Sequence, residues 1–149
     1  LLVKPNAALN DAQKEILADM KNIYIIGGEG AVSVDIEAEL AAYGEVIRVF
    51  GATRYETSVA VAETFFETVE KVVVANGKNF PDGLCGGPFA AAMNAPLILT
   101  ADGKTDAAEG YVTDNGIESG FVLGGTGALA DESVVSVFDL ESADEIIAK

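Results

Sequence analysis

The chain has 149 residues, half of them hydrophobic, and carries 9 Lys and Arg against 24 Asp and Glu, for a net charge of −15. This length and composition predict a folded domain and exclude general attraction to the backbone of a nucleic acid. One cysteine and no histidine are present, which excludes an intrachain disulfide framework and hydrolases that need a histidine base within these residues.

Short apolar runs alternate with segments of helical period along the chain. Strands are expected at residues 22–26, 45–50, 71–75, 95–100 and 119–123. Their nearly continuous apolar, β-branched character is typical of strands covered on both faces. No apolar run reaches 18 residues, so membrane insertion is not expected. The chain starts without Met or a signal-peptide pattern, and we expect it to be a piece of a longer protein.

Helices are expected between these strands. The clearest spans residues 55–67, where apolar side chains recur at helical spacing. Asn10 or Asp11 can cap a helix that buries Ile16, Leu17 and Met20; Ser33 can cap one that buries Ile36 and Leu40. Further helices are expected at 84–93, 106–114 and, strongly acidic, 142–148. The alternation predicts a three-layer α/β fold with a mainly parallel sheet.

An internal repeat divides the chain. Residues 24–32 match residues 121–129 position for position, with Gly27 and Gly124 97 positions apart. This spacing suits tandem copies of a small α/β module. Residues 1–50 are therefore expected to be the C-terminal half of one repeat. Residues 51–149 are expected to form one essentially complete repeat with an acidic C-terminal helix, and the two parts can pack as one compact unit.

Each repeat carries a Gly-Gly-x-Gly turn between a strand and a helix, where backbone N–H groups can bind an anion. The alternative is a tight turn that needs positive φ. Neither turn is a full dinucleotide fingerprint, and no Walker motif occurs. The glycines concerned are Gly27, Gly28, Gly30, Gly124, Gly125 and Gly127.

Polar residues also follow the other strands, at the edge where ligands bind to a parallel sheet. Arg54 can hold a carboxylate or phosphate with its planar fork; alternatively it pairs with a neighbouring acid or carbonyl, while Glu56 stabilises the helix start. Lys78, Asn79 and Asp82 surround the start of another helix, and there the alternative reading makes Asp82 its N-cap and Phe80 a hydrophobic staple.

The sequence does not indicate a metal site or a reactive cysteine at these positions. Asp82, Asp102 and Asp106 do not have the spacing of an EF-hand loop. Cys85, among small residues, is expected to be a buried hydrophobe, because no histidine can activate it. We predict no metal, no cofactor and no catalytic residue.

Four ordered motifs carry a resemblance to a known family. Gly51–Thr57, Val72–Gly77 with Asn79–Leu84, Ala95–Thr100 and Gly124–Ala128 together resemble the cell wall binding repeat 2 family, from residue 51 to about residue 140. Thr53 stands where the family typically has Asp, and Gly83 where it typically has Ala.

The resemblance implies a secreted bacterial surface protein with tandem repeats of Rossmann-like or Toprim-like fold, attached non-covalently to an anionic cell-wall polysaccharide. It implies a non-catalytic role and sibling repeats as partners. One alternative is a structural repeat that packs with its siblings without ligand; another is an enzyme domain for a nucleotide or sugar phosphate. The expected polymer-binding residues are Arg54, Glu56, Thr57, Lys78, Asn79, Asp82, Lys104 and the six turn glycines.

Overall fold

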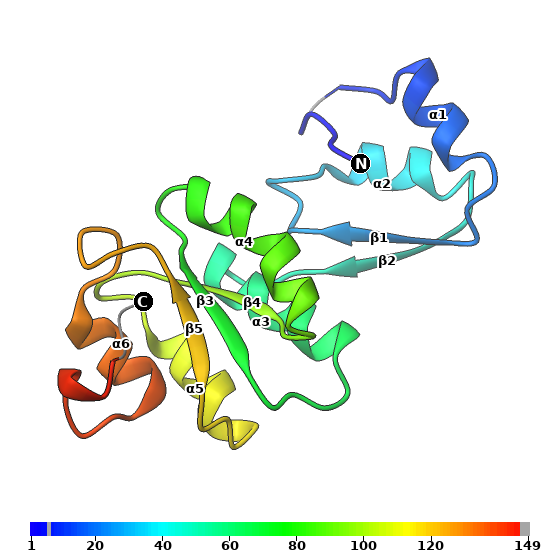
Figure 1. The fold of residues 1–149 in the computed structure, drawn as a ribbon. Coiled ribbons are helices and arrows are strands. Elements are labelled where there is room, and N and C mark those ends of the chain that lie inside the picture. The colour runs from blue at the N-terminus through cyan, green and yellow to red at the C-terminus, as the bar shows by residue number, and fades with distance from the viewer. Residues whose placement is uncertain (6, 147–149) are drawn as a thin grey trace.

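A computed structural model describes residues 1–5 and 7–146 and shows helices and strands in alternation (Figure 1). The five expected strands are present, with ends within two residues of those expected. The elements are α1 (Asp11–Leu17), β1 (Asn22–Ile26), α2 (Val34–Leu40), β2 (Glu45–Val49), α3 (Arg54–Phe65), β3 (Val72–Asn76), α4 (Pro81–Ala92), β4 (Leu97–Thr100), α5 (Asp106–Asp114), β5 (Gly120–Leu123), α6 (Asp131–Phe138) and the 3₁₀ helix η1 (Ala143–Glu145).

The strands form two parallel sheets. β1 pairs with β2, and β3 lies between β4 and β5 in the second sheet. The second sheet is covered on both faces: Val72, Val74 and Ile98 pack in a cluster with residues of α3, α5 and α6, while Val73 packs with Ala90 of α4 on the other side. This arrangement confirms the three-layer, parallel α/β fold (Figure 1).

The first sheet is covered more fully on one face than on the other. Ile23 and Ile25 of β1 are buried with Ile36 and Leu40 of α2 and with residues of α1. On the opposite face Tyr24 is exposed, and its ring packs edge-on against Phe65 of α3, with ring centroids 4.8 Å apart.

The sequence repeat is also a repeat of backbone structure. Gly27 and Gly124 both have positive φ, +120° and +101°. In each turn the carbonyl of the following residue, Gly28 or Gly125, accepts hydrogen bonds from two N–H groups, and a helix comes next, α2 or α6. The two copies then diverge, because α2 leads into a strand while α6 leads into η1.

Several expected features are wrong. The acidic segment near 142–148 forms only the short 3₁₀ helix η1, and residues 147–149 lie outside the described residues. Helix α6 was not foreseen, because its β-branched residues favour a strand in isolation. Ile16 and Met20 are exposed, and of the expected trio only Leu17 is buried. Cys85 is exposed on α4.

Gly51 fixes the junction between β2 and α3. A Cβ atom there would lie 2.7 Å from the Glu56 carbonyl carbon and 2.9 Å from the Thr57 nitrogen. Both are backbone atoms of a helix and cannot move away cheaply.

We expect Gly51→Ala to lower the free energy of unfolding by about 1–3 kcal/mol, because overpacking strains the helix start. Gly30→Ala is the matched control: a Cβ at Gly30 meets no atom within 4 Å, and the change is expected to stay within about 0.5 kcal/mol. Urea unfolding followed by circular dichroism measures both. Equal effects of the two substitutions would contradict this account of the junction.

Candidate functional site

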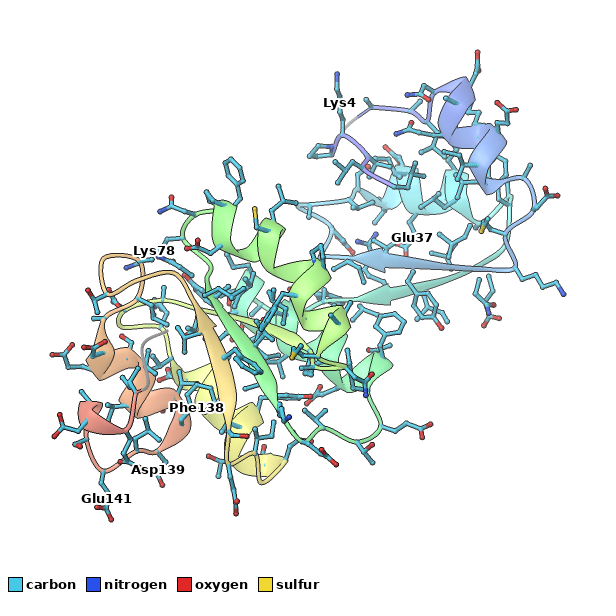
Figure 2. The ribbon with its side chains drawn as sticks, viewed as in Figure 1. Lys4, Glu37, Lys78, Phe138, Asp139 and Glu141 are labelled. Carbon is cyan, nitrogen blue, oxygen red and sulfur yellow. The ribbon has the colours of Figure 1, made fainter. Side chains whose placement is uncertain are left out.

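The carboxyl ends of β3, β4 and β5 meet at one edge of the second sheet, here called the carboxyl edge. Its surface is made by the start of α3 and by residues 77–80, 101–105 and 124–130. Lys78 projects there near the β5–α6 turn (Figure 2). The expected site residues from Arg54 onward all lie in these segments or in the first turn of α4. Gly27, Gly28 and Gly30 belong to the other sheet.

Two of the expected residues build the start of α3. Thr53 is its N-cap and accepts a hydrogen bond from the Tyr55 N–H at 3.2 Å, while the Glu56 carboxylate accepts one from the Thr53 N–H at 2.5 Å. The Thr57 hydroxyl donates to the Thr53 carbonyl at 2.8 Å and accepts from the Gly51 N–H at 3.0 Å. Glu56 and Thr57 therefore have structural roles in a capping box and its support.

Arg54 ties α3 to the loop after β3. Its Nη1 donates to the Gly77 carbonyl at 2.8 Å, as the alternative reading of this arginine expected. Within the described residues this is its one hydrogen bond. Because Arg54 is exposed, the rest of the guanidinium fork can reach an acceptor from solvent.

Asn76 joins two loops of the carboxyl edge. It is only 6% exposed. Its Nδ2 donates to the Ala128 carbonyl in the β5–α6 turn, and its Oδ1 accepts from the Lys78 N–H at 2.8 Å. Asn76, the polar last residue of an otherwise apolar strand, therefore fixes the positions of Lys78 and of the second glycine turn.

Asp102 connects the β4–α5 loop to the start of α6. Its Oδ1 accepts from the Ala130 N–H at 2.9 Å and from the Ser133 hydroxyl at 2.8 Å. The Ala130 N–H, then the Ser133 hydroxyl, lower the pKa of Asp102 below its usual value, with a smaller contribution from the Lys78 charge. The Lys78 ammonium donates to the Asp102 carbonyl at 3.4 Å.

The start of α4 differs from the alternative prediction, in which Asp82 is the N-cap and Phe80 a hydrophobic staple. The helix begins at Pro81, so Phe80 takes the N-cap position, without a side-chain hydrogen bond, and Asp82 lies inside the first turn. Proline is favoured at the first helical position, which moves the cap one residue before it. Phe80 is 77% exposed and Leu84 71% exposed, so no hydrophobic staple forms. The Asp82 carboxylate lies against Gly124, where an added Cβ would come within 2.9 Å of Oδ2.

The glycine turns have the conformation that the tight-turn interpretation predicts. Gly27 and Gly124 have the positive φ that the tight-turn reading requires. The other N–H groups of each turn point to no acceptor in the described part of the chain. These groups belong to Gly28, Glu29, Gly30, Gly125, Thr126 and Gly127.

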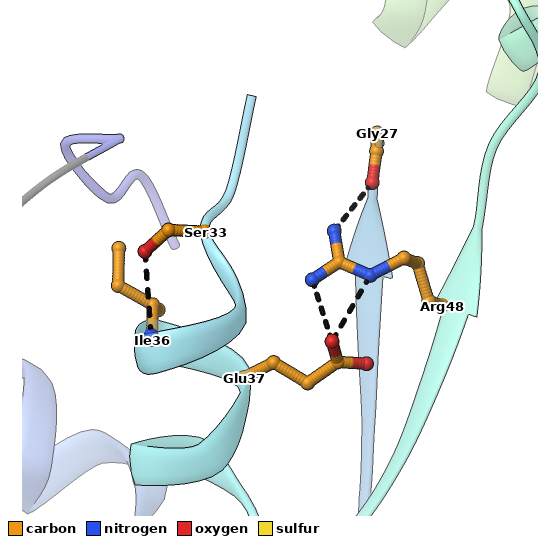
Figure 3. Close-up of polar contacts among 5 residues, drawn as sticks. All are labelled: Gly27, Ser33, Ile36, Glu37 and Arg48. Carbon is orange, nitrogen blue, oxygen red and sulfur yellow. Dashed lines mark hydrogen bonds and ion pairs between the residues drawn. The ribbon is translucent and has the colours of Figure 1, made fainter. Parts of the chain in front are cut away.

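Arg48 was missed by the sequence analysis. Its Nη1 donates to the Gly27 carbonyl at 2.8 Å, and its Nε and Nη2 donate to Glu37 Oε2 at 3.3 and 2.8 Å (Figure 3). Its side chain is 11% exposed, and this partly buried side chain connects β2 to the first glycine turn. The feature of the sequence that could have indicated a role for Arg48 is its charge within an otherwise apolar strand.

The charged side chains Lys78 and Lys104 are exposed in the loops of the carboxyl edge. Two hollows lie elsewhere: one of about 290 Å³ between the N-terminal segment and α2, and one of about 210 Å³ at the opposite end of β3, beside Lys71 and Asn94. Lys104 is exposed in the turn after β4 and forms no ion pair within residues 1–5 and 7–146. The same residues contain no group of three or more potential metal ligands.

The family match decides the identity of the fold. The family described as cell wall binding domain 2 (CWB2) matches residues 48–135, more than half of the chain. The chain belongs to this family. The resemblance inferred from the motifs is confirmed, and membership assigns the chain to the cell wall or cell surface. Among the described residues, no helix is long and apolar enough to span a membrane.

Two relatives come from Bacillus subtilis strain 168. The chain is 34% identical over 105 residues to the amidase enhancer, covering 70% of this chain and 15% of the relative. It is 33% identical over 113 residues to N-acetylmuramoyl-L-alanine amidase LytC, covering 74% of this chain and 23% of the relative. The chain thus spans less than a quarter of either protein.

Two solved structures from Clostridium difficile have the same fold. Cwp8 matches 94% of this CWB2 chain with a TM-score of 0.79 and 31% identity, over 24% of its own length. Cwp6 matches 86% of the chain with a TM-score of 0.75 and 23% identity, over 22% of its length.

Asn76→Ala tests whether the carboxyl edge depends on this side chain. We expect a loss of about 1–3 kcal/mol in the free energy of unfolding, because the Ala128 carbonyl and the Lys78 N–H lose their partner. Asn79→Ala, at an exposed position in the same loop, is expected to change it by less than about 0.5 kcal/mol. Chemical denaturation measures both, and a neutral Asn76→Ala would show that the loops are held by other contacts.

Ser133→Ala is expected to raise the pKa of Asp102 toward its ordinary value, because one hydrogen bond to the carboxylate is lost. A lowered folded-state pKa stabilises the protein above about pH 4, and this contribution disappears as the pH falls through the folded-state value. The Ser133→Ala variant should therefore be less stable than the unsubstituted chain at neutral pH, and this difference in free energy of unfolding should become smaller in acid. Carboxyl-carbon NMR titration measures the pKa.

Ser136→Ala is the control for this titration. The Ser136 hydroxyl donates to Glu109 and is the main cause of the lowered pKa of that residue. The Ser136→Ala substitution should raise the pKa of Glu109 and leave the pKa of Asp102 unchanged. An unchanged Asp102 pKa in Ser133→Ala would contradict the assigned hydrogen bond.

Proposed function

We propose that this CWB2 chain is a non-catalytic anchoring repeat that binds an anionic cell-wall polymer at its carboxyl edge. The observation that carries the proposal is the placement of charge there. Arg54 at the start of α3 and Lys78 and Lys104 in the loops of this edge are exposed. Glu56 and Asp102 are exposed as well, but their carboxylates accept hydrogen bonds from backbone N–H groups. A chain with a net charge of −15 thus presents cations at this edge.

The exposure of the charged side chains at the edge supports a polymer rather than a small enclosed ligand. Small-molecule sites are concave and bury most of their ligand, and the two hollows described above lie away from Arg54 and Lys78. The exposed ring of Phe80 stands in the same loop as Lys78 and Asn79, and offers an apolar surface to a sugar ring beside the charged groups. The open N–H groups of the glycine turns are further donors for anionic groups.

A non-catalytic role agrees with the lowered pKa of Asp102 at the carboxyl edge. A general acid needs a raised carboxyl pKa, whereas the pKa of Asp102 is lowered by its two hydrogen bonds. The chain has no histidine to act as a base. The alternative of a nucleotide or sugar-phosphate enzyme therefore has only the glycine turns in its favour.

Binding to purified cell walls tests the proposal. We expect Arg54→Ala and Lys78→Ala each to weaken binding about tenfold or more, because each removes a charge-assisted hydrogen bond worth about 1.5–3 kcal/mol. Lys71→Ala is the matched control: it removes the same charge from an exposed position at the amino end of β3 and should leave binding unchanged. Equilibrium sedimentation with the walls measures the bound fraction.

Two further conditions separate specific from general attraction. Walls from which the anionic polymers have been removed should retain little of the chain, and added salt should weaken binding to the intact walls. Equal losses in Lys71→Ala and Lys78→Ala would show that binding follows total charge and not this edge. Retention on stripped walls equal to that on intact walls would refute the anionic polymer as the ligand.

A further inference from the structure

The outer edge of β5 is open. β5 pairs in parallel with β3 on one side, from Val72↔Gly120 to Ala75↔Leu123, and no strand within residues 1–5 and 7–146 pairs with its other side. The opposite edge of the sheet is protected, because the Leu99 N–H of β4 donates to the Ser58 hydroxyl of α3 at 2.9 Å. An open edge is a template for pairing with another strand.

The first half of the chain shows what occupies the equivalent edge. β1 stands 97 positions before β5 and pairs in parallel with β2, including Ile23↔Val46 and Ile25↔Arg48. The pairing ends with the Gly27 N–H, which donates to the Val49 carbonyl at 2.9 Å. Gly124 has the same backbone turn, but its N–H has no such partner in the described residues.

The chain's own segment does not fill this place. Residues 142–146 are the equivalents of β2 at the repeat spacing, and they contain η1. The Ser142 hydroxyl accepts from the Asp144 N–H, and the Glu145 carboxylate accepts from the Ser142 N–H. This capping fixes the segment as a turn and not as a strand.

The family match shows where a replacement strand originates. The match begins at residue 48, inside β2, and ends at residue 135, inside α6. The last two residues of β2, Arg48 and Val49, thus lie inside the matched repeat, whereas the whole strand pairs with β1 in the sheet of the preceding copy. One repeat therefore gives its first strand to the last strand of the copy before it.

We propose that the outer edge of β5 binds, in parallel, the first strand of another repeat of this family. That strand continues the sheet as β4-β3-β5-strand, in the same relation that β2 has to β1. The site is distinct from the carboxyl-edge residues Arg54 and Lys78, so it can be tested independently of polymer binding.

The outer edge of β5 and the edge of β1 that pairs with β2 differ in one respect, which determines the residues that a binding strand can carry. Arg48 of β2 is balanced by Glu37 of α2, and the position equivalent to Glu37 on α6 is Val134, which is buried. A charged arginine at the matching place would therefore find no carboxylate at the position of α6 that corresponds to Glu37. A neutral hydrogen-bond donor fits better, because it can reach the Gly124 carbonyl, as Arg48 reaches that of Gly27, without an unpaired charge.

A peptide with the sequence of residues 43–52 carrying Arg48→Gln serves as the probe. It is added to the ¹⁵N-labelled 149-residue chain up to millimolar concentration, because an untethered strand binds weakly. We expect concentration-dependent shifts and slowed amide exchange at Val122 and Gly124. The same peptide with Ile47→Pro and Val49→Pro loses two central N–H donors on its pairing side and should have no effect.

The native-sequence peptide measures the contribution of Val134. With Arg48 retained, we expect about tenfold weaker binding, because a buried unpaired polar group costs more than a hydrogen bond contributes. Equal affinity of the two peptides would overturn the proposed role of Val134. No protection at Val122 and Gly124, equal protection by the proline peptide, or protection at Leu99 or Ile25 instead would overturn the proposed site.

Discussion

The burial of β3 is the constraint on which the second half of the molecule depends. Val72, Val73, Val74 and Ala75 are all 0% exposed, so both faces of this strand need helices and both edges need strands. The strand ends in Asn76, whose amide would be costly to bury alone. Its two hydrogen bonds hold the next loop and the second glycine turn together. The core therefore determines where the polar loops of the carboxyl edge lie.

The strong negative charge of the chain and its proposed anionic ligand are compatible because of these local hydrogen bonds. A carboxylate that accepts from backbone N–H groups is oriented by them, as Glu56 and Asp102 are. Arg54 and Lys78 are held at the same edge through the carbonyls of Gly77 and Asp102. Net charge describes the field far from the molecule, whereas a bound ligand meets the groups that face it.

Local patterns in the sequence were sufficient for the strands, the parallel α/β class and the clearest helices, because continuous apolar runs and helical spacing are local signals. They did not predict the division into two sheets, which depends on pairing between distant strands. Pro81 moved the start of α4 and left Phe80 exposed. The ion pair of Arg48 with Glu37 forms only when β2 and α2 come together. The order of strands and loops predicted that the residues from Arg54 onward share one edge, whereas Gly27, Gly28 and Gly30 lie at the other sheet. The structural roles of Glu56 and Thr57 depend on contacts that no motif specifies.

Pairing and sequence place the boundary between repeats differently, and the difference has a physical consequence. β2 completes the sheet of the first copy but leads directly, through Gly51, into α3 of the second. A two-stranded sheet has little stability of its own, and β1 without β2 would expose a second edge. The strand that joins two copies is therefore also the strand that stabilises the earlier one. Under the predicted division into repeats, the folding of consecutive copies is coupled, because hydrogen bonds between β1 and β2 hold the two copies together.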